Sequence, residues 1–324
     1  MRSWPRHGNW FPHNRVLPMS ESTAALLLTR QRRRLGERII MVILQVCAAV
    51  SVITTFGIIL SLIIPSIEFF RSVPVTDFLF GTQWTPLFAD AQYGVLPLLS
   101  GTLVITIIAV GVAIPLGLGA AVYLSEYASD RARRILKPIL EVLAGIPTVV
   151  FGFFALEFVT QVVLVRIFPG IEIFNALSAG LVMGIMIIPT VASLSEDAMA
   201  AVPGGLRDGS YALGASKRQT ALKVVIPAAL SGIVAAFVLG ISRAIGETMI
   251  VTVAAGLEPQ LTLNPLVGMQ TMTSYIAAAG LGDLATGTLE YQTIFAVGLL
   301  LFILTFLMNM GSIRLVRKFR QVYQ

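Results

Sequence analysis

Reactive and metal-binding side chains are scarce in this sequence. It contains one cysteine, Cys47, and two histidines, His7 and His13. A single cysteine excludes a disulfide bond or a cysteine metal cluster within the chain, and no group of residues resembles a catalytic triad. We therefore predict no enzyme activity, no metal site and no cofactor. The GxxxxGK[S/T] loop that cradles nucleotide phosphates is also absent, so any ATP hydrolysis must belong to another chain.

Charge is the second scarcity. Only 12% of the 324 residues are charged and 56% are hydrophobic, which gives a mean hydropathy of +0.84. The apolar residues fall into long blocks, a pattern typical of an integral membrane protein. Four uncharged stretches can each hold the roughly 20 apolar residues that cross a bilayer. They are residues 39–67, 91–125, 173–195 and 291–313.

Two further spans are predicted if isolated charges are tolerated. Residues 142–165 contain only Glu157, which we expect near the outer interface, and residues 224–257 contain only Arg243 and Glu247. Residues 259–282 are uncharged but rich in polar side chains, so we expect an amphipathic or re-entrant segment at the outer face. The predicted fold is all-α, with six transmembrane helices.

Lysine and arginine predict the orientation, because they are retained on the cytoplasmic side of short loops. Twenty of the 23 basic residues fall on one side of a six-span arrangement, which predicts cytoplasmic amino and carboxyl termini. The net charge of +6 is then explained by basic residues that set the membrane orientation, and we predict no nucleic-acid partner. We expect residues 1–38 to be a poorly ordered basic arm and residues 39–320 a membrane domain. Its cytoplasmic coupling loop covers residues 195–223.

This coupling loop has a pattern of short helices and breaks. Residues 196–197 fit the first turn of one helix, which the Pro-Gly-Gly run at 203–205 would end. A second helix is expected over residues 208–213, with Gly214 ending it and Ser216 capping a third. The pattern predicts short levers that fit a groove on a soluble partner. An amphipathic loop lying on the inner leaflet is the alternative.

The spacing within the loop favours the lever. Asp208 is followed at fixed intervals by Gly214 and by an apolar-x-apolar-Pro end at residues 224–227. This resembles the cytoplasmic signature of ATP-binding-cassette (ABC) importer permeases, although Asp-Gly-Ser replaces the usual Glu-Ala-Ala. In that family the loop docks into the ATPase subunit. The resemblance implies an ATPase-coupling role for Asp208, Tyr211, Ala212, Leu213, Gly214, Ala215 and Ser216.

A charged pair interrupts the fifth predicted span. Arg243 lies 15 residues beyond Ala228, about 22 Å along a helix and well inside the membrane. At such a depth, the free energy of inserting a lone arginine into the bilayer is about 2.5 to 3.5 kcal/mol. Glu247, one turn further on the same helix face, is the nearest compensating charge. One interpretation is a structural ion pair. The other is an anion gate, because a guanidinium fork matches phosphate or carboxylate oxygens and Glu247 can hold it between passages.

The string SRAIGETMIVT, residues 242–252, resembles the fifth helix of phosphate-specific ABC importer permeases. Their two subunit types share R-A-x-G-E-T, and a following Met and Val-Thr pair, here Met249 and residues 251–252, marks the C-type. Similar strings extend the resemblance over nearly all of residues 39–320. The resemblance implies a type I importer permease fold, with Arg243, Glu247 and Thr248 along the pathway of inorganic phosphate.

The partners that this resemblance implies are an A-type permease subunit, a dimer of ATPase subunits and an external phosphate-binding protein. Two alternatives remain open at this point. The chain can be a permease for another oxyanion, such as molybdate or sulfate, or a proton-coupled secondary carrier in which Arg243 and Glu247 form a relay. The coupling-loop spacing and the absence of paired half-repeats argue against the carrier.

Overall fold

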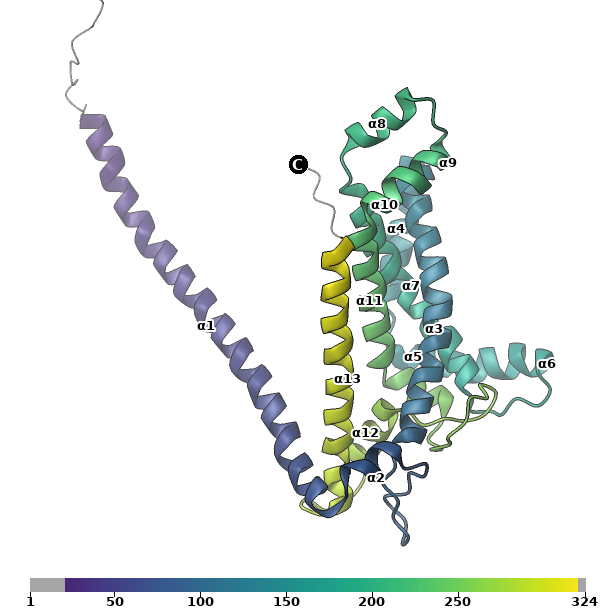
Figure 1. Ribbon diagram of the computed structural model, residues 1–324. Coiled ribbons are helices and arrows are strands. Elements are labelled where there is room, and N and C mark those ends of the chain that lie inside the picture. Colours follow the sequence, from purple (N-terminus) through teal and green to yellow (C-terminus); the bar gives the residue numbers. More distant parts are fainter. Residues whose placement is uncertain (1–20, 320–324) are drawn as a thin grey trace, which may run out of the picture. The chain divides into compact units, whose positions relative to one another are not determined.

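The computed structural model describes the backbone of residues 21–319 and the side chains of residues 37–314 (Figure 1). Within this part of the chain the secondary structure is helical, and the only β-type pairing is an isolated bridge between Trp84 and Tyr93. The prediction of an all-α fold is therefore confirmed.

Five helical segments of the described chain are long and apolar enough to cross a membrane, and a sixth is bent by 72°. The bent span joins residues Lys217–Ala228 to residues Leu230–Ile245. The six predicted spans are therefore confirmed if the bent pair counts as one. The five others are Glu37–Ser72 within α1 (Glu21–Ser72), Leu96–Tyr127, Thr148–Ile167, Ala176–Ala200 (α7) and Leu289–Arg314 within α13 (Leu289–Phe319).

Helix α1 divides between two compact units, residues 1–60 and residues 61–324. The helix begins at Glu21, so residues 21–38, expected to be poorly ordered, are helical, and Ile39 is not an element boundary. Residues 1–20 of the predicted arm lie outside the described residues. The side chains of residues 39–58 are exposed.

The core of the second unit is the packing of α3 (Leu96–Val122) against α7. Glycine allows these two helices to approach closely. A Cβ atom at Gly184 would lie 2.7 Å from Cβ of Val112, and one at Gly117 would lie 2.8 Å from Cβ of Val191. The buried side chains around this contact form the largest apolar cluster, to which the third and fifth spans also contribute. A π-helical turn, η1 (Tyr123–Tyr127), extends α3.

The third span begins later than predicted. Residues 142–145 belong to a separate helix, α4 (Asp130–Gly145), and the span starts at α5 (Thr148–Phe153). Pro147 causes this break, because the residue before a proline avoids the helical region, and Ile146 is extended with φ −68° and ψ 130°. The span continues through the π-helix η2 (Phe154–Leu164) into α6 (Val165–Ile167).

The fifth span is discontinuous, whereas the sequence predicted one helix over residues 224–257. It starts with α9 (Lys217–Thr220), η3 (Ala221–Val225) and α10 (Ile226–Ala228), bends at Ala229 and continues as α11 (Leu230–Ile245). Beyond a second break at residues 246–248, a short half-helix from Met249 contains η4 (Val251–Ala255). Gly256 ends it with φ +88°, a value that favours glycine.

Residues 259–282 form no seventh span. Their only helix, α12 (Met272–Leu281), has ten residues, about 15 Å of helix, which is half the thickness of the hydrocarbon core. Its first turn is buried. The segment before α12 has no regular secondary structure and lies against α3, where the carbonyl oxygen of Gln270 occupies the space a Cβ atom at Gly101 would need. The segment thus folds back into the core, as a re-entrant segment would.

Candidate permeation site and coupling loop

Arg243 lies in the last turn of α11 and is half-buried against α7. Its Nη1 atom donates to Oγ1 of Thr190 at 3.0 Å, and Nη2 lies 3.8 Å from the sulfur of Met186. Among the residues that the structure describes, no carboxylate forms an ion pair with Arg243. A guanidinium has five N–H donors. Neutral partners engage only two of its nitrogens, so donors remain for an anion.

Glu247 does not form the predicted pair with Arg243. Helix α11 ends at Ile245, and Gly246 (φ −88°, ψ 0°) begins the break, so the four-residue spacing no longer places both side chains on one helix face. The Glu247 carboxylate is 9% exposed and accepts hydrogen bonds from the backbone amides of Met249 (3.0 Å) and Ile250 (3.3 Å). It therefore caps the half-helix that begins at Met249 and complements the positive end of this half-helix.

The re-entrant segment fixes this break. The Thr273 hydroxyl donates to the carbonyl oxygen of Glu247 at 2.6 Å, in a buried position. Thr271 caps α12 through a reciprocal capping box with Ser274, which sets the position of Thr273. Thr248 lies within the break, half-buried, and its carbonyl oxygen accepts from the Thr252 hydroxyl at 2.6 Å. Hydrogen bonds to the carbonyl oxygens of Glu247 and Thr248 thus help to fix the conformation of the break.

The sequence analysis missed two of these partners, Thr190 and Thr273. Thr190 follows the proline of the fourth span and is 53 residues from Arg243, and Thr273 is 26 residues from Glu247. A polar residue after Pro189 and a serine–threonine cluster in the re-entrant segment were visible signals. Neither signal indicates which charged residue the threonine contacts in the folded chain.

The coupling loop departs from the expected pattern at its start. Glu196 and Asp197 belong to the last turns of α7 and not to a separate helix. Helix α8 (Gly204–Ala212) begins directly after Pro203, so the glycines at 204 and 205 open a helix instead of ending one. Proline before the first helical turn explains the difference, because its fixed φ suits a helix start.

The glycine that ends α8 and the serine that caps the next helix are as predicted. Gly214 has φ +80°, and its amide donates to the Tyr211 carbonyl at 2.9 Å. Ser216 caps the next helix through a capping box with Gln219. Leu213 is 91% exposed and Tyr211 is 43% exposed, so an apolar ridge stands free at the tip. The other predicted coupling residues are exposed, apart from the half-buried Ala215; they are Asp208, Ala212, Gly214 and Ser216.

An arginine clamp that the sequence analysis did not identify ties α8 to the second span. Nη2 of Arg207 lies 3.0 Å from Oε1 of Glu126, which is 8% exposed at the end of η1. The same guanidinium donates to the carbonyl oxygens of Val202 (2.8 Å) and Met199 (2.9 Å) at the end of α7. These contacts connect α8 both to η1, which extends α3, and to the end of α7.

A second ionic cluster joins α4 to the end of α7. Nζ of Lys137 lies 3.1 Å from Oε2 of Glu196 and 3.6 Å from Oδ1 of Asp197. Glu196 is 4% exposed, and Arg133 approaches its other oxygen at 3.7 Å. Hydrogen bonding to Glu196 raises the pKa of Lys137 above its ordinary value of 10.5. Glu157, by contrast, is exposed and accepts from Gln161 of its own helix at 3.0 Å.

Known proteins have sequences similar to that of this chain. The model of the family described as "Binding-protein-dependent transport system inner membrane component" matches residues 113–321, which include Arg243, Glu247 and the whole coupling loop. The probable ABC transporter permease protein YqgH of Bacillus subtilis (strain 168) is 36% identical over 285 residues, 87% of this chain and 91% of that protein.

The phosphate transport system permease protein PstC of Haemophilus influenzae is 31% identical over 317 residues, 91% of this chain and 99% of that protein. Among solved structures, a bacterial ABC transporter involved in alginate import superposes with a TM-score of 0.54 at 14% identity, over 84% of this chain and 99% of that one. The fold of an ABC importer permease is thereby confirmed. The chain belongs to the inner-membrane components of binding-protein-dependent transport systems, and it is a multi-pass permease subunit of the plasma membrane, not an enzyme.

Proposed function

We propose that this chain is the C-type permease subunit of an ATP-driven importer of inorganic phosphate. The observation that carries the proposal is the half-buried guanidinium of Arg243, held by neutral partners on α7 beside a break in its own helix. The R-A-x-G-E-T string at this place and the relatives named as phosphate permeases support phosphate as the anion.

The geometry supports a binding step at Arg243. A phosphate that reaches the break can accept two parallel hydrogen bonds from the unengaged donors of the guanidinium. The Glu247 carboxylate is held by the half-helix amides and does not neutralise the arginine in this conformation. In the gate that we propose, Glu247 releases these amides and pairs with Arg243 after the anion has left. Thr248 adds a polar group to the same break.

The coupling loop supplies the energy input in this proposal. The exposed ridge of Tyr211 and Leu213 docks into the ATPase subunit dimer, and the arginine clamp carries its movement to the spans. The remaining partners are an A-type permease subunit and an external phosphate-binding protein. Both termini lie in the cytoplasm, as the distribution of basic residues indicates.

The test is uptake of radiolabelled phosphate by proteoliposomes that contain the purified complex and its binding protein. Arg243→Gln should reduce uptake by at least about 100-fold, because a charge-assisted bidentate contact is worth about 1.5 to 3 kcal/mol per bond. Arg243→Lys keeps the charge but loses the fork and should be intermediate. Arg166→Gln, which removes an arginine outside the site, should transport normally.

Three results would contradict the proposal. Undiminished uptake by Arg243→Gln would leave Arg243 with a structural role only. Competition by sulfate or molybdate as strong as by phosphate itself would assign another oxyanion. Uptake that continues without ATP and stops when a protonophore removes the proton gradient would assign a secondary carrier.

A further inference from the structure

A cavity opens at the end of the second unit opposite the coupling loop. It has a volume of about 660 Å³ and lies between the end of α1, helix α2 (Val75–Phe80), the loop at residues 81–94 and the start of α13. Figure 1 places α2 and α8 at opposite ends of α3. In the orientation of the proposed function, this outer pocket therefore faces the compartment from which the substrate arrives.

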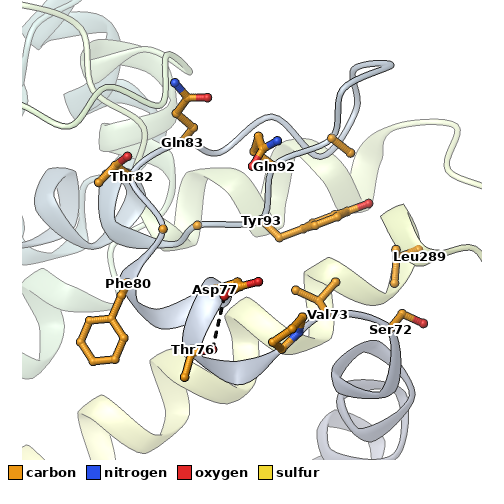
Figure 2. Close-up of a pocket in the computed structure, with 14 residues that line it drawn as sticks. Ser72, Val73, Thr76, Asp77, Phe80, Thr82, Gln83, Gln92, Tyr93 and Leu289 are labelled. Atoms are coloured by element: carbon orange, nitrogen blue, oxygen red, sulfur yellow. Dashed lines mark hydrogen bonds between the residues drawn. The ribbon is translucent and has the colours of Figure 1, made fainter.

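The lining of the outer pocket is mostly polar. Figure 2 shows Asp77 rising from α2 toward the loop that carries Gln92 and Tyr93, with Thr76 beside it, whereas Phe80 points away. Burial and the carboxylate of Glu290 raise the pKa of Tyr93, so its hydroxyl stays protonated and can donate. The pocket thus presents amides, hydroxyls and a single carboxylate.

The walls of the pocket are rigid. The amide of Thr85 donates to the Gln92 carbonyl at 2.8 Å, and the amide of Gly94 donates to the Gln83 carbonyl at 2.9 Å, which closes the loop as a hairpin. A Cβ atom at Gly94 would lie 2.2 Å from the backbone of Gly81, so the two strands of the loop touch. Beneath them lies the second apolar cluster of buried residues. A preformed concave site of this kind loses little entropy on binding.

Asp77 has no counter-ion among the residues that the structure describes. Its side chain is exposed, its one hydrogen-bond partner is the Thr76 hydroxyl at 3.3 Å, and it belongs to no ion pair among the described residues. Acidic residues also outnumber basic ones at the ends of the spans and in the segments between them at this end. The acids are Glu68, Asp77, Asp90, Glu172, Glu258, Asp283 and Glu290, and the bases are Arg71 and Arg166.

This charge balance identifies the class of occupant. A carboxylate without a counter-ion repels phosphate, so the pocket is not a station for the transported anion. The pocket attracts a cationic group. Its size suits a long basic side chain, and so do the hydrogen-bond donors and acceptors of its hydroxyl and amide groups. Leu87 and Phe88 on the same hairpin are 58% and 72% exposed, and exposed apolar groups next to a polar pocket are typical of a protein-docking surface.

We propose that the outer pocket receives a lysine or arginine side chain of the external binding protein, with Asp77 as its counter-ion. This inference rests on the proposed function, because it takes the binding protein as the partner. The contact steers the loaded binding protein onto the permease, since complementary charges at an interface raise the rate of association.

The experiment uses the complete complex in proteoliposomes, titrated with its purified binding protein. The measured quantity is the binding-protein concentration that gives half-maximal stimulation of ATP hydrolysis. Asp77→Lys should raise this concentration by about tenfold or more, because it places like charges in contact, and Asp77→Asn should raise it less. Both effects should shrink as salt increases. Glu258→Gln removes one negative charge from another pocket at the same end and should leave the concentration unchanged.

Phosphate uptake at saturating binding protein separates this proposal from the proposed function. Asp77→Lys should still import phosphate there, which also shows that the variant has folded. An Asp77→Lys titration that matches Glu258→Gln would overturn the docking contact even if phosphate uptake is normal. In a second arm, a photo-reactive residue at Gln92 should cross-link to the binding protein. Cross-linking to lipid or to the other permease subunit alone would also overturn it.

Discussion

Removal of the arginine clamp should loosen the coupling loop from the membrane spans. In Arg207→Ala, the buried carboxylate of Glu126 loses the guanidinium, whose Nε and Nη2 atoms lie 3.3 and 3.0 Å from its Oε1 atom. The carbonyl oxygen of Val202 loses its donor in the same substitution, and that of Met199 keeps only backbone donors such as the amide of Val202 at 3.1 Å. The Ser125 hydroxyl, 3.0 Å from the same carboxylate oxygen, is the partner that remains.

The size of the effect follows from the burial of the pair. Breaking a fully buried ion pair costs about 3 to 5 kcal/mol. The side chain of Glu126 is 4% exposed, but that of Arg207 is 21% exposed, so water recovers part of the loss and we expect about 2 to 3 kcal/mol. At 1.4 kcal/mol per factor of ten, local opening of the loop becomes about 30 to 150 times more frequent.

Hydrogen exchange on the assembled complex measures this opening directly, because amides exchange when a segment opens locally. Peptides that cover residues 203–216 should exchange faster in Arg207→Ala by the factor above. The rate of stimulated ATP hydrolysis should decrease in the same variant. Arg218→Ala is the matched control, since Arg218 is an exposed arginine of the same loop and forms no ion pair among the described residues. Exchange in Arg207→Ala within twofold of this control would refute the clamp.

Three further predictions concern the loop, the helix break and the ionic cluster. Gly214→Val forces a branched side chain to φ +80°, at a cost of at least about 1 to 2 kcal/mol, so co-purification of the ATPase should be lost while Ser216→Thr retains it. Thr273→Val leaves the Glu247 carbonyl without its buried donor and should lower thermal stability by about 1 to 3 kcal/mol; an unchanged melting temperature would contradict the contact. The pKa of Lys137 is raised in the folded protein, so its charge stabilises the fold at pH values below the ordinary pKa of 10.5, and this contribution is lost as pH rises through the higher folded pKa. Lys137→Met should therefore lower the free energy of unfolding by the same amount at pH 6 and at pH 9. A difference between the two pH values would contradict this assignment.

Most of the fold could be predicted because a bilayer imposes its thickness on the sequence. The uncharged runs at residues 91–125, 173–195 and 291–313 match observed spans, and the polar residues of the segment at 259–282 kept it from being counted as a seventh. Local rules also placed the end of the lever, since Gly214 takes a positive φ and Ser216 caps the next helix.

The errors arose where a helix is interrupted or where the partner is distant in sequence. Apolar runs continue across Pro147 and Gly246, so hydropathy alone gave one helix at each place. The Arg243–Glu247 pair followed from an unbroken helix and failed when α11 ended at Ile245. The clamp joins Arg207 to a residue 81 positions away, a contact that no local pattern encodes.

The most direct test of the central claim is a density map of the assembled importer with phosphate trapped during turnover. The account predicts phosphate oxygens about 2.7 to 2.9 Å from the guanidinium nitrogens of Arg243, with Glu247 still capping the half-helix that begins at Met249. A phosphate bound elsewhere along the pathway while the Arg243 side chain packs against lipid or a neighbouring helix would contradict it.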